Sequence, residues 1–199
     1  VVVSRLLQLV NSPYMGFASE TLSLETAISR LGYQLLETLV LMLTVKSQLK
    51  DPRLNQVLDS QFTYAGKCRE LAKQLSFNRL QQDQVFIVAL LSGFGKLVLL
   101  RNGCELTDPE LQDVQASERL TYLAVTAFLL TLWGFDEALV SLVIYQQQWR
   151  DGPEYKVAQC LWVARHWQHG ALRSQDKALP ARIKAAGYGA LLPAVHSSA

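Results

Sequence analysis

Apolar residues recur along most of the chain at the three- and four-residue spacing of an α-helix. In one stretch, four apolar residues would share a single helical face: Leu24, Ala27, Ile28 and Leu31. Ser23 suits the N-cap of this helix, and Gly32 suits the position just past its end. No alternation of apolar and polar residues typical of a strand continues beyond a few residues. The pattern therefore predicts an all-α fold.

The same spacing, together with capping residues, predicts the order of the helices. We expect them at residues 1–10, 24–31, 33–49, 52–75, 82–91, 118–133, 137–149 and 153–169, with a short helical turn at 180–186. Asp51, Ser117 and Asp136 are the expected N-caps of three of these helices. Asp108 and Pro109 indicate the start of a further short helix.

The helices are expected to form two packed lobes, residues 1–50 and residues 51–170, followed by a C-terminal extension at residues 171–199. The chain begins without Met, in a segment that looks like the middle of a helix. We therefore expect a fragment of a longer protein, or a chain whose natural N-terminus is not represented.

Composition supports a folded core and argues against two classes of partner. Hydrophobic residues make up 50% of the 199 residues and charged residues 18%, which is typical of a globular chain. A net charge of +2 creates no strong field for a nucleic acid. Two apolar stretches, residues 35–45 and 120–133, are shorter than the roughly 20 residues that a membrane-spanning helix needs. We therefore expect neither a nucleic-acid partner nor a membrane.

The three cysteines, Cys68, Cys104 and Cys160, form no Cys-x-x-Cys pair. An odd number of widely separated cysteines fits a reducing compartment better than a disulfide framework. We therefore expect a cytoplasmic protein with ordinary thiols.

A break in the apolar pattern lies at residues 92–95, between two segments expected to be buried. The sequence there, Ala89-Leu90-Leu91-Ser92-Gly93-Phe94-Gly95-Lys96-Leu97, resembles the His-Asp-Ile-Gly-Lys-Leu signature of the HD metal-dependent phosphohydrolases, without its His-Asp pair. Residues 4–16, 23–32 and 129–135 are similar to segments of one relative of that superfamily, the HDOD domain of bacterial signalling proteins. The resemblance implies an HD-like multi-helix bundle packed against an N-terminal helical lobe.

The resemblance also implies where metal ligands would stand. In HD hydrolases, His and Asp side chains hold a divalent cation, which lowers the pKa of a bound water molecule. Alignment by hand places these residues at or beside the ligand positions: Tyr64, Ser92, Gly93, Tyr122, Gln146, Gln147 and Arg165. No His precedes His166, and a guanidinium at position 165 would repel a cation. We therefore expect no metal, no other cofactor and no catalytic residue.

The vacated cleft is expected to be filled. Tyr64 and Tyr122 are large enough to occupy much of it, with hydroxyls that reach polar neighbours such as Ser92 or Gln146. Arg165 cannot lose its proton, so in a closed cleft we expect it to pair with an acidic side chain.

The resulting hypothesis is a non-catalytic regulatory module of bacterial signal transduction, which acts by binding a signalling protein. The identity of this partner and the oligomeric state, including a homo-oligomer, stay open. One alternative is a nucleotide-binding sensor that uses the vacated cleft, with Arg165, Lys96 and the two tyrosines as contacts. A second alternative is a metal-dependent phosphohydrolase with ligands elsewhere. His166 and His169 could share one helical face for a metal, although a polar helix surface is the simpler interpretation.

Overall fold

The fold is helical throughout the part of the chain that the structure describes. This computed structural model describes residues 2–12, 15, 23–103, 121–168 and 179–188. In chain order the elements are α1 (Val2–Val10), α2 (Leu24–Leu31), α3 (Tyr33–Gln48), α4 (Pro52–Gln74), α5 (Arg79–Leu91), α6 (Phe94–Arg101), α7 (Tyr122–Leu132), α8 (Glu137–Tyr145), the 3-10 turn η3 (Pro153–Tyr155), α9 (Lys156–Gln168), α10 (Leu179–Ile183) and the turn η4 (Lys184–Tyr188). These ranges contain no strand, so the predicted all-α class is confirmed.

Three predicted N-caps are present. The side chains of Ser23, Asp51 and Asp136 each accept a hydrogen bond from a backbone N–H in the first turn of α2, α4 and α8 respectively. Gly32 separates α2 from α3 with φ of 76°, a conformation that suits glycine. Sequence-local capping therefore sets these boundaries.

Three other boundaries differ from the prediction. Helix α7 begins at Tyr122 with Thr121 as its N-cap, whereas Ser117 was the expected cap. Helix α8 ends at Tyr145, four residues before the expected end at 149. Helix α5 begins three residues earlier than expected, because Asn78 and Gln81 form a reciprocal capping box.

The expected helix start at Asp108 and Pro109 and the expected cap Ser117 lie outside the described residues, as do Cys104, His169 and the segment 189–199.

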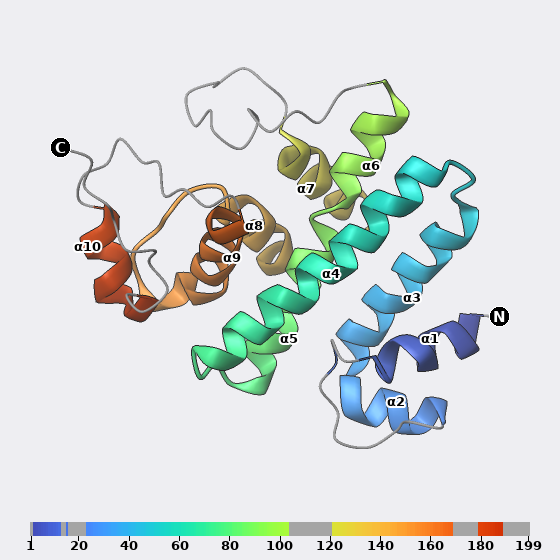
Figure 1. Ribbon diagram of the computed structural model, residues 1–199, viewed down its shortest axis with the longest axis horizontal. Helices are drawn as coiled ribbons and strands as arrows, with labels where there is room; N and C mark the ends of the chain where they lie inside the picture. The colour runs from blue at the N-terminus through green and yellow to red at the C-terminus, as the bar shows by residue number, and fades with distance from the viewer. Residues whose placement is uncertain (1, 13–14, 16–22, 104–120, 169–178, 189–199) are drawn as a thin grey trace.

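Helices α4 and α5 form the centre of the molecule. Figure 1 shows them side by side through its middle, with α1, α2 and α3 on one side and α8, α9 and α10 on the other. Helix α9 packs against both central helices, and α6 packs against α7. Residues from the N-terminal helices and from the bundle share one hydrophobic core, which runs from Leu6 in α1 to Tyr188 at the end of η4.

Helix α5 is buried on every side along its second half. Seven consecutive residues, Val85–Leu91, each have at most 2% of their surface exposed. By length and composition the stretch Arg79–Arg101 could cross a membrane, but most of its apolar window is buried inside the fold. It also turns between α5 and α6. This is the pattern of a central core helix.

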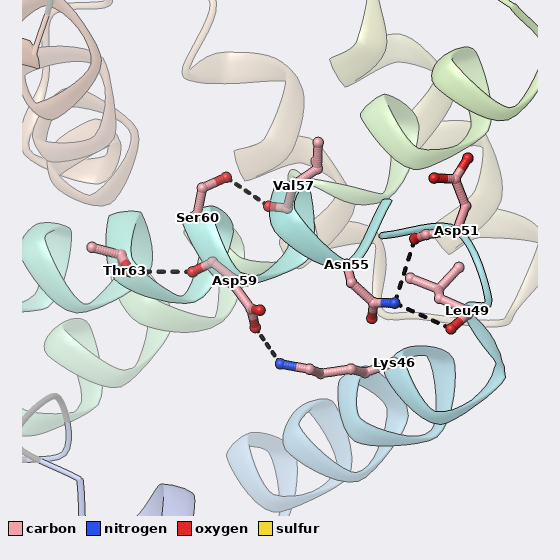
Figure 2. A network of polar contacts seen from close by, with 8 residues as sticks. All are labelled: Lys46, Leu49, Asp51, Asn55, Val57, Asp59, Ser60 and Thr63. Atoms are coloured by element: carbon pink, nitrogen blue, oxygen red, sulfur yellow. Dashed lines mark hydrogen bonds and ion pairs between the residues drawn. The ribbon is translucent and has the colours of Figure 1, made fainter. Parts of the chain in front are cut away.

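Polar contacts fix α3 against α4. The Asn55 amide in α4 donates hydrogen bonds to the backbone carbonyls of Leu49 and Asp51, at 3.1 and 3.4 Å (Figure 2). The Leu49 carbonyl lies at the C-cap of α3, where helix geometry leaves it without a partner inside the helix. The Asp51 carbonyl also accepts from the backbone N–H of Asn55, as the N-cap of α4. Lys46 of α3 forms an ion pair with Asp59 of α4 along the same face.

A mostly buried ion pair joins α4 to α5. The Arg69 Nη2 group lies 2.5 Å from the carboxylate of Asp83, with 9% and 14% of the two side chains exposed. The same guanidinium lies 3.2 Å from the sulfur of Met15 and over the ring of Phe86. Because Met15 precedes α2, Arg69 links the N-terminal helices to the central pair.

Residues 179–188 of the C-terminal extension contribute to the core. Its segment α10–η4 buries Ile183 and Tyr188, which have 1% and 2% of their surface exposed. The Tyr188 hydroxyl donates to the carbonyl of Lys156 at 3.1 Å, and Arg182 pairs with Asp151 at 2.8 Å. Figure 1 shows this segment beyond α8 and α9, at the edge of the bundle.

Candidate functional site: the cleft at the HD position

Five helical elements bring together most of the residues that the resemblance selected. Tyr64 comes from α4, Ser92 and Gly93 from the turn between α5 and α6, and Tyr122 from the first position of α7. Gln146 follows the last residue of α8, and Arg165 lies on α9. Residues up to 101 positions apart in sequence therefore meet in one place, which we call the cleft.

A chain of hydrogen bonds crosses the cleft from α5 to α9. The Ser92 hydroxyl donates to the carbonyl of Val88 at 2.6 Å and accepts from the Gln146 amide nitrogen at 2.8 Å. The Gln146 amide oxygen then accepts from Nη2 of Arg165 at 2.8 Å. Ser92 and Gln146 are fully buried. Both the nitrogen and the oxygen of the Gln146 amide are hydrogen-bonded to side chains of the same chain, as expected for a buried amide.

Arg165 differs from the expectation in its choice of partner. No carboxylate of the described residues pairs with Arg165, whose hydrogen-bond acceptor is the neutral amide of Gln146. Its guanidinium lies over the ring of Tyr122, with 5.6 Å between Cζ and the ring centroid. Within the described residues, an amide and an aromatic ring therefore stand where an acidic partner was predicted.

The two tyrosines also differ from the expectation in their contacts. The Tyr64 hydroxyl donates to the carbonyl of Leu161 in α9, at 3.4 Å, and does not bond to Ser92 or Gln146. Tyr122 uses its ring, which lies 4.7 Å from the Nζ atom of Lys96 and also faces Arg165. Both tyrosines pack at the cleft, as expected, but they act there chiefly through their rings and one backbone bond.

Burial controls ionisation in the cleft. It raises the pKa of Tyr64 well above the ordinary value for a phenol and raises the pKa of the Cys68 thiol, one turn further along α4, to about 12. Burial acts to lower the pKa of Arg165, but Tyr122 and Tyr64 offset it, and this pKa stays above its ordinary value. At neutral pH the Tyr64 phenol and the Cys68 thiol are therefore neutral, and Arg165 is a guanidinium cation.

The space beside Gly93 is filled by a side chain that the sequence did not indicate. A Cβ atom on Gly93 would lie 2.6 Å from Cγ of Gln61, which is far inside van der Waals contact. Gln61 has 4% of its surface exposed and donates from its amide to the carbonyl of Ala89. The only sequence signal was a glutamine three residues before Tyr64, on an otherwise apolar face of α4.

Thr126 supports the turn that carries Ser92 and Gly93. Its hydroxyl oxygen accepts from the backbone N–H of Gly95 at 2.8 Å, and it lies 2.8 and 3.0 Å from the carbonyls of Tyr122 and Ser92. A Cβ atom on Gly95 would come 1.8 Å from the Tyr122 carbonyl oxygen. Close approach of α6 to α7 thus requires glycine at position 95. Sequence reasoning missed this role of Thr126, which stands inside an apolar helix.

Gln147 lies beside the cleft and takes no part in its hydrogen-bond chain. Its amide donates to the hydroxyl of Thr121, the N-cap of α7, at 3.1 Å. Of the two glutamines placed at the HD position by alignment, only Gln146 contacts the other cleft residues.

The cleft does not fit the divalent cation that the HD superfamily implies. Among the described residues, the side chains of the cleft supply hydroxyl and amide oxygens and a guanidinium, but no imidazole or carboxylate. Elsewhere in the described residues, no three His, Cys, Asp or Glu side chains gather in a way that could hold a metal ion. The side chain of His166 and all of His169 lie outside what the structure describes, so that histidine pair stays a hypothesis.

Comparison with known proteins identifies the fold. A protein from Shewanella amazonensis SB2B, named as a candidate phosphohydrolase, has a crystal structure that superposes with a TM-score of 0.57 at 23% identity, covering 94% of this chain and 72% of that one. The MmoQ response regulator from Methylococcus capsulatus str. Bath gives a TM-score of 0.43 at 20% identity, covering 94% and 80%. No curated protein matches the chain significantly.

The family is established by the sequence itself. The profile of the HDOD domain matches residues 1–149, which is most of the chain. This range includes Tyr64, Ser92, Gly93, Tyr122 and Gln146 of the cleft but ends before α9 and Arg165. The predicted resemblance to the HDOD domain is confirmed, and the chain belongs to the HDOD domain family.

Proposed function

We propose that the chain is a non-catalytic regulatory module of bacterial signal transduction, which works in the cytoplasm by binding a signalling protein. The observation that carries this proposal is the chemistry of the cleft. Where HD hydrolases hold a cation between imidazoles and carboxylates, this chain carries a serine, a glutamine and a protonated arginine. Membership of the HDOD family supports the regulatory part of the proposal.

The packing of the cleft also supports a role without turnover. Gln61 occupies the space beside Gly93, and Gln146 closes the distance between Ser92 and Arg165. A metal-activated water would need both space and negative ligands at this position. These residues supply no negative ligand, so binding is the activity that the proposal assigns.

The experiment combines metal content with turnover. Protein purified without chelators is analysed for Mn, Fe, Ni and Zn and is assayed with a chromogenic phosphodiester in the presence of added Mn²⁺. We expect well under one metal per chain and no hydrolysis above a blank without protein. One bound equivalent together with metal-dependent turnover would overturn the proposal and favour the phosphohydrolase alternative.

A further inference from the structure

Arg165 is a cation that the described fold leaves without a counter-charge. Its Nη2 group bonds to the neutral Gln146 amide, and its guanidinium stacks over the Tyr122 ring. An aromatic ring attracts a cation but does not neutralise it. A partly buried charge next to neutral groups therefore leaves positive potential in the cleft.

Part of the Arg165 side chain is open to solvent, because the residue is half-buried. An arginine side chain carries five N–H donors, and the one protein acceptor bonded to Arg165 is Gln146. Among the described residues, Ser12 Oγ is the only sealed side-chain polar atom without a partner, so the remaining guanidinium nitrogens are not sealed inside the protein. They are available to a ligand.

Lys96 places a second positive charge next to the Tyr122 ring. Its Nζ atom lies 4.7 Å from the centroid of Tyr122, and Lys96 is half-buried at the start of α6. No described carboxylate forms an ion pair with it. One tyrosine ring therefore contacts two cations from two helices, and nothing in the described part of the chain balances them.

We propose that the cleft binds an oxyanion of the phosphate-monoester class, with Arg165 as its anchor and Lys96 as an added source of attraction. A planar guanidinium with open donors matches two oxygens of a phosphate group. The position is the one at which an HD hydrolase holds a metal cation, and here a side chain supplies the positive charge. This inference goes beyond the proposed function, because it assigns a ligand and does not depend on the protein partner.

The test uses inorganic phosphate as the probe. Calorimetric titration of the whole chain in a low-salt, phosphate-free buffer should show one site that weakens as NaCl is added. Arg165→Gln should reduce the affinity by at least about tenfold, which is the usual weight of a charged hydrogen-bonded contact. Lys96→Gln should reduce it only a few-fold.

Arg150 provides a matched control. It also stacks on tyrosine rings, 4.4 Å from the centroid of Tyr145 and 5.6 Å from that of Tyr155, but it is exposed and these rings are not the cleft tyrosines. Arg150→Gln removes one positive charge and the same kind of ring contact, and should leave phosphate affinity unchanged. Equal losses in Arg150→Gln and Arg165→Gln would show nonspecific attraction and overturn the inference.

A second measurement covers the case in which Arg165→Gln does not fold. In the unaltered chain, the Nε–Hε resonance of Arg165, assigned through its own side-chain correlations, should shift on addition of phosphate and not on addition of equimolar chloride. Absence of that shift, or absence of heat at the highest soluble phosphate concentration, overturns the site. Titration with adenosine monophosphate then distinguishes a bare phosphate ligand from a nucleotide, since only a nucleotide ligand should bind more tightly than phosphate.

Discussion

Gly93, which the HD signature aligns with an aspartate, is closely packed against another helix. Without a Cβ atom at this position, Gln61 of α4 lies directly against the turn between α5 and α6 and bonds to the carbonyl of Ala89. A carboxylate placed back at position 93 would collide with a buried side chain from another helix.

Substitution of Gly93 by alanine should therefore destabilise the fold. The new Cβ atom would meet Gln61 Cγ at 2.6 Å, and overpacking of this kind costs about 1–3 kcal/mol. Gln61→Ala in the same chain should remove part of that cost, because it removes the atom that clashes. Urea unfolding of the two single variants and the double variant measures the coupling between them.

Gly95→Ala provides the contrast in this experiment. Its Cβ atom would meet backbone, the Tyr122 carbonyl oxygen at 1.8 Å, so it should cost more than Gly93→Ala and Gln61→Ala should not relieve it. Strictly additive free energies for Gly93→Ala and Gln61→Ala would contradict this account of the cleft.

At the scale of elements, the packing of α6 against α7 depends on one buried hydroxyl group. Thr126 accepts from the backbone N–H of Gly95, for which the described residues offer no other acceptor. Thr126→Val keeps the shape but leaves that N–H buried and unpaired, at a cost of about 1–3 kcal/mol. Thr131→Val on the same helix is the matched control. Its hydroxyl bonds only to the Ala127 carbonyl one turn earlier, so it should stay within about 0.5 kcal/mol of the unaltered protein.

Equilibrium unfolding followed by far-UV circular dichroism measures both threonine variants. A cost for Thr131→Val equal to that for Thr126→Val would show that the helix-internal bond is what matters, and that the contact to Gly95 contributes nothing measurable.

The helices themselves could be predicted because their signals are local. Ser23, Asp51 and Asp136 cap the helices that follow them, through side chains within three residues of the backbone groups they bond. The start of α5 was missed, because the apolar pattern begins only at Val85 and the capping box lies before it. The spacing of apolar residues alone predicts where a helix lies, but it does not predict the position of the first turn.

The sequence could predict which residues lie in the cleft, but not which contacts they make there. A family signature placed Ser92, Tyr122, Gln146 and Arg165 in one region, and the hydrogen bonds and ring contacts join them. No sequence rule indicates that a guanidinium will choose an amide and a ring over a carboxylate, because that choice depends on which side chains four other helices bring near it. The same reason hid Gln61, whose partner is 28 residues away.

At the scale of the whole molecule, the folded unit extends past the segment that defines the family. The HDOD profile ends at residue 149, yet α9 packs against both central helices and supplies Arg165. Beyond it, Tyr188 stacks edge-on against Trp149, which in turn stacks against Trp162 of α9, with centroid distances of 5.8 and 5.4 Å. The segment α10–η4 therefore helps to hold α9, and through it the cleft.

Tyr188→Ala should consequently destabilise α9 as well as the segment α10–η4. The ring is almost fully buried, and loss of a buried aromatic ring costs about 3–5 kcal/mol. Loss of its bond to the Lys156 carbonyl removes a further anchor from the first turn of α9. Thermal unfolding should show a lowered midpoint, and hydrogen exchange should increase along α9 before it increases in α5.

Tyr33→Ala is the control for this prediction, since 76% of the Tyr33 surface is exposed and its loss should change stability by no more than about 0.5 kcal/mol. If Tyr188→Ala lowered protection only within residues 179–188 and left α9 unchanged, α10–η4 would be an independent appendage. If protection fell in α9 as well, phosphate affinity in the same variant should fall with it, because Arg165 depends on α9 for its position against Tyr122 and Gln146.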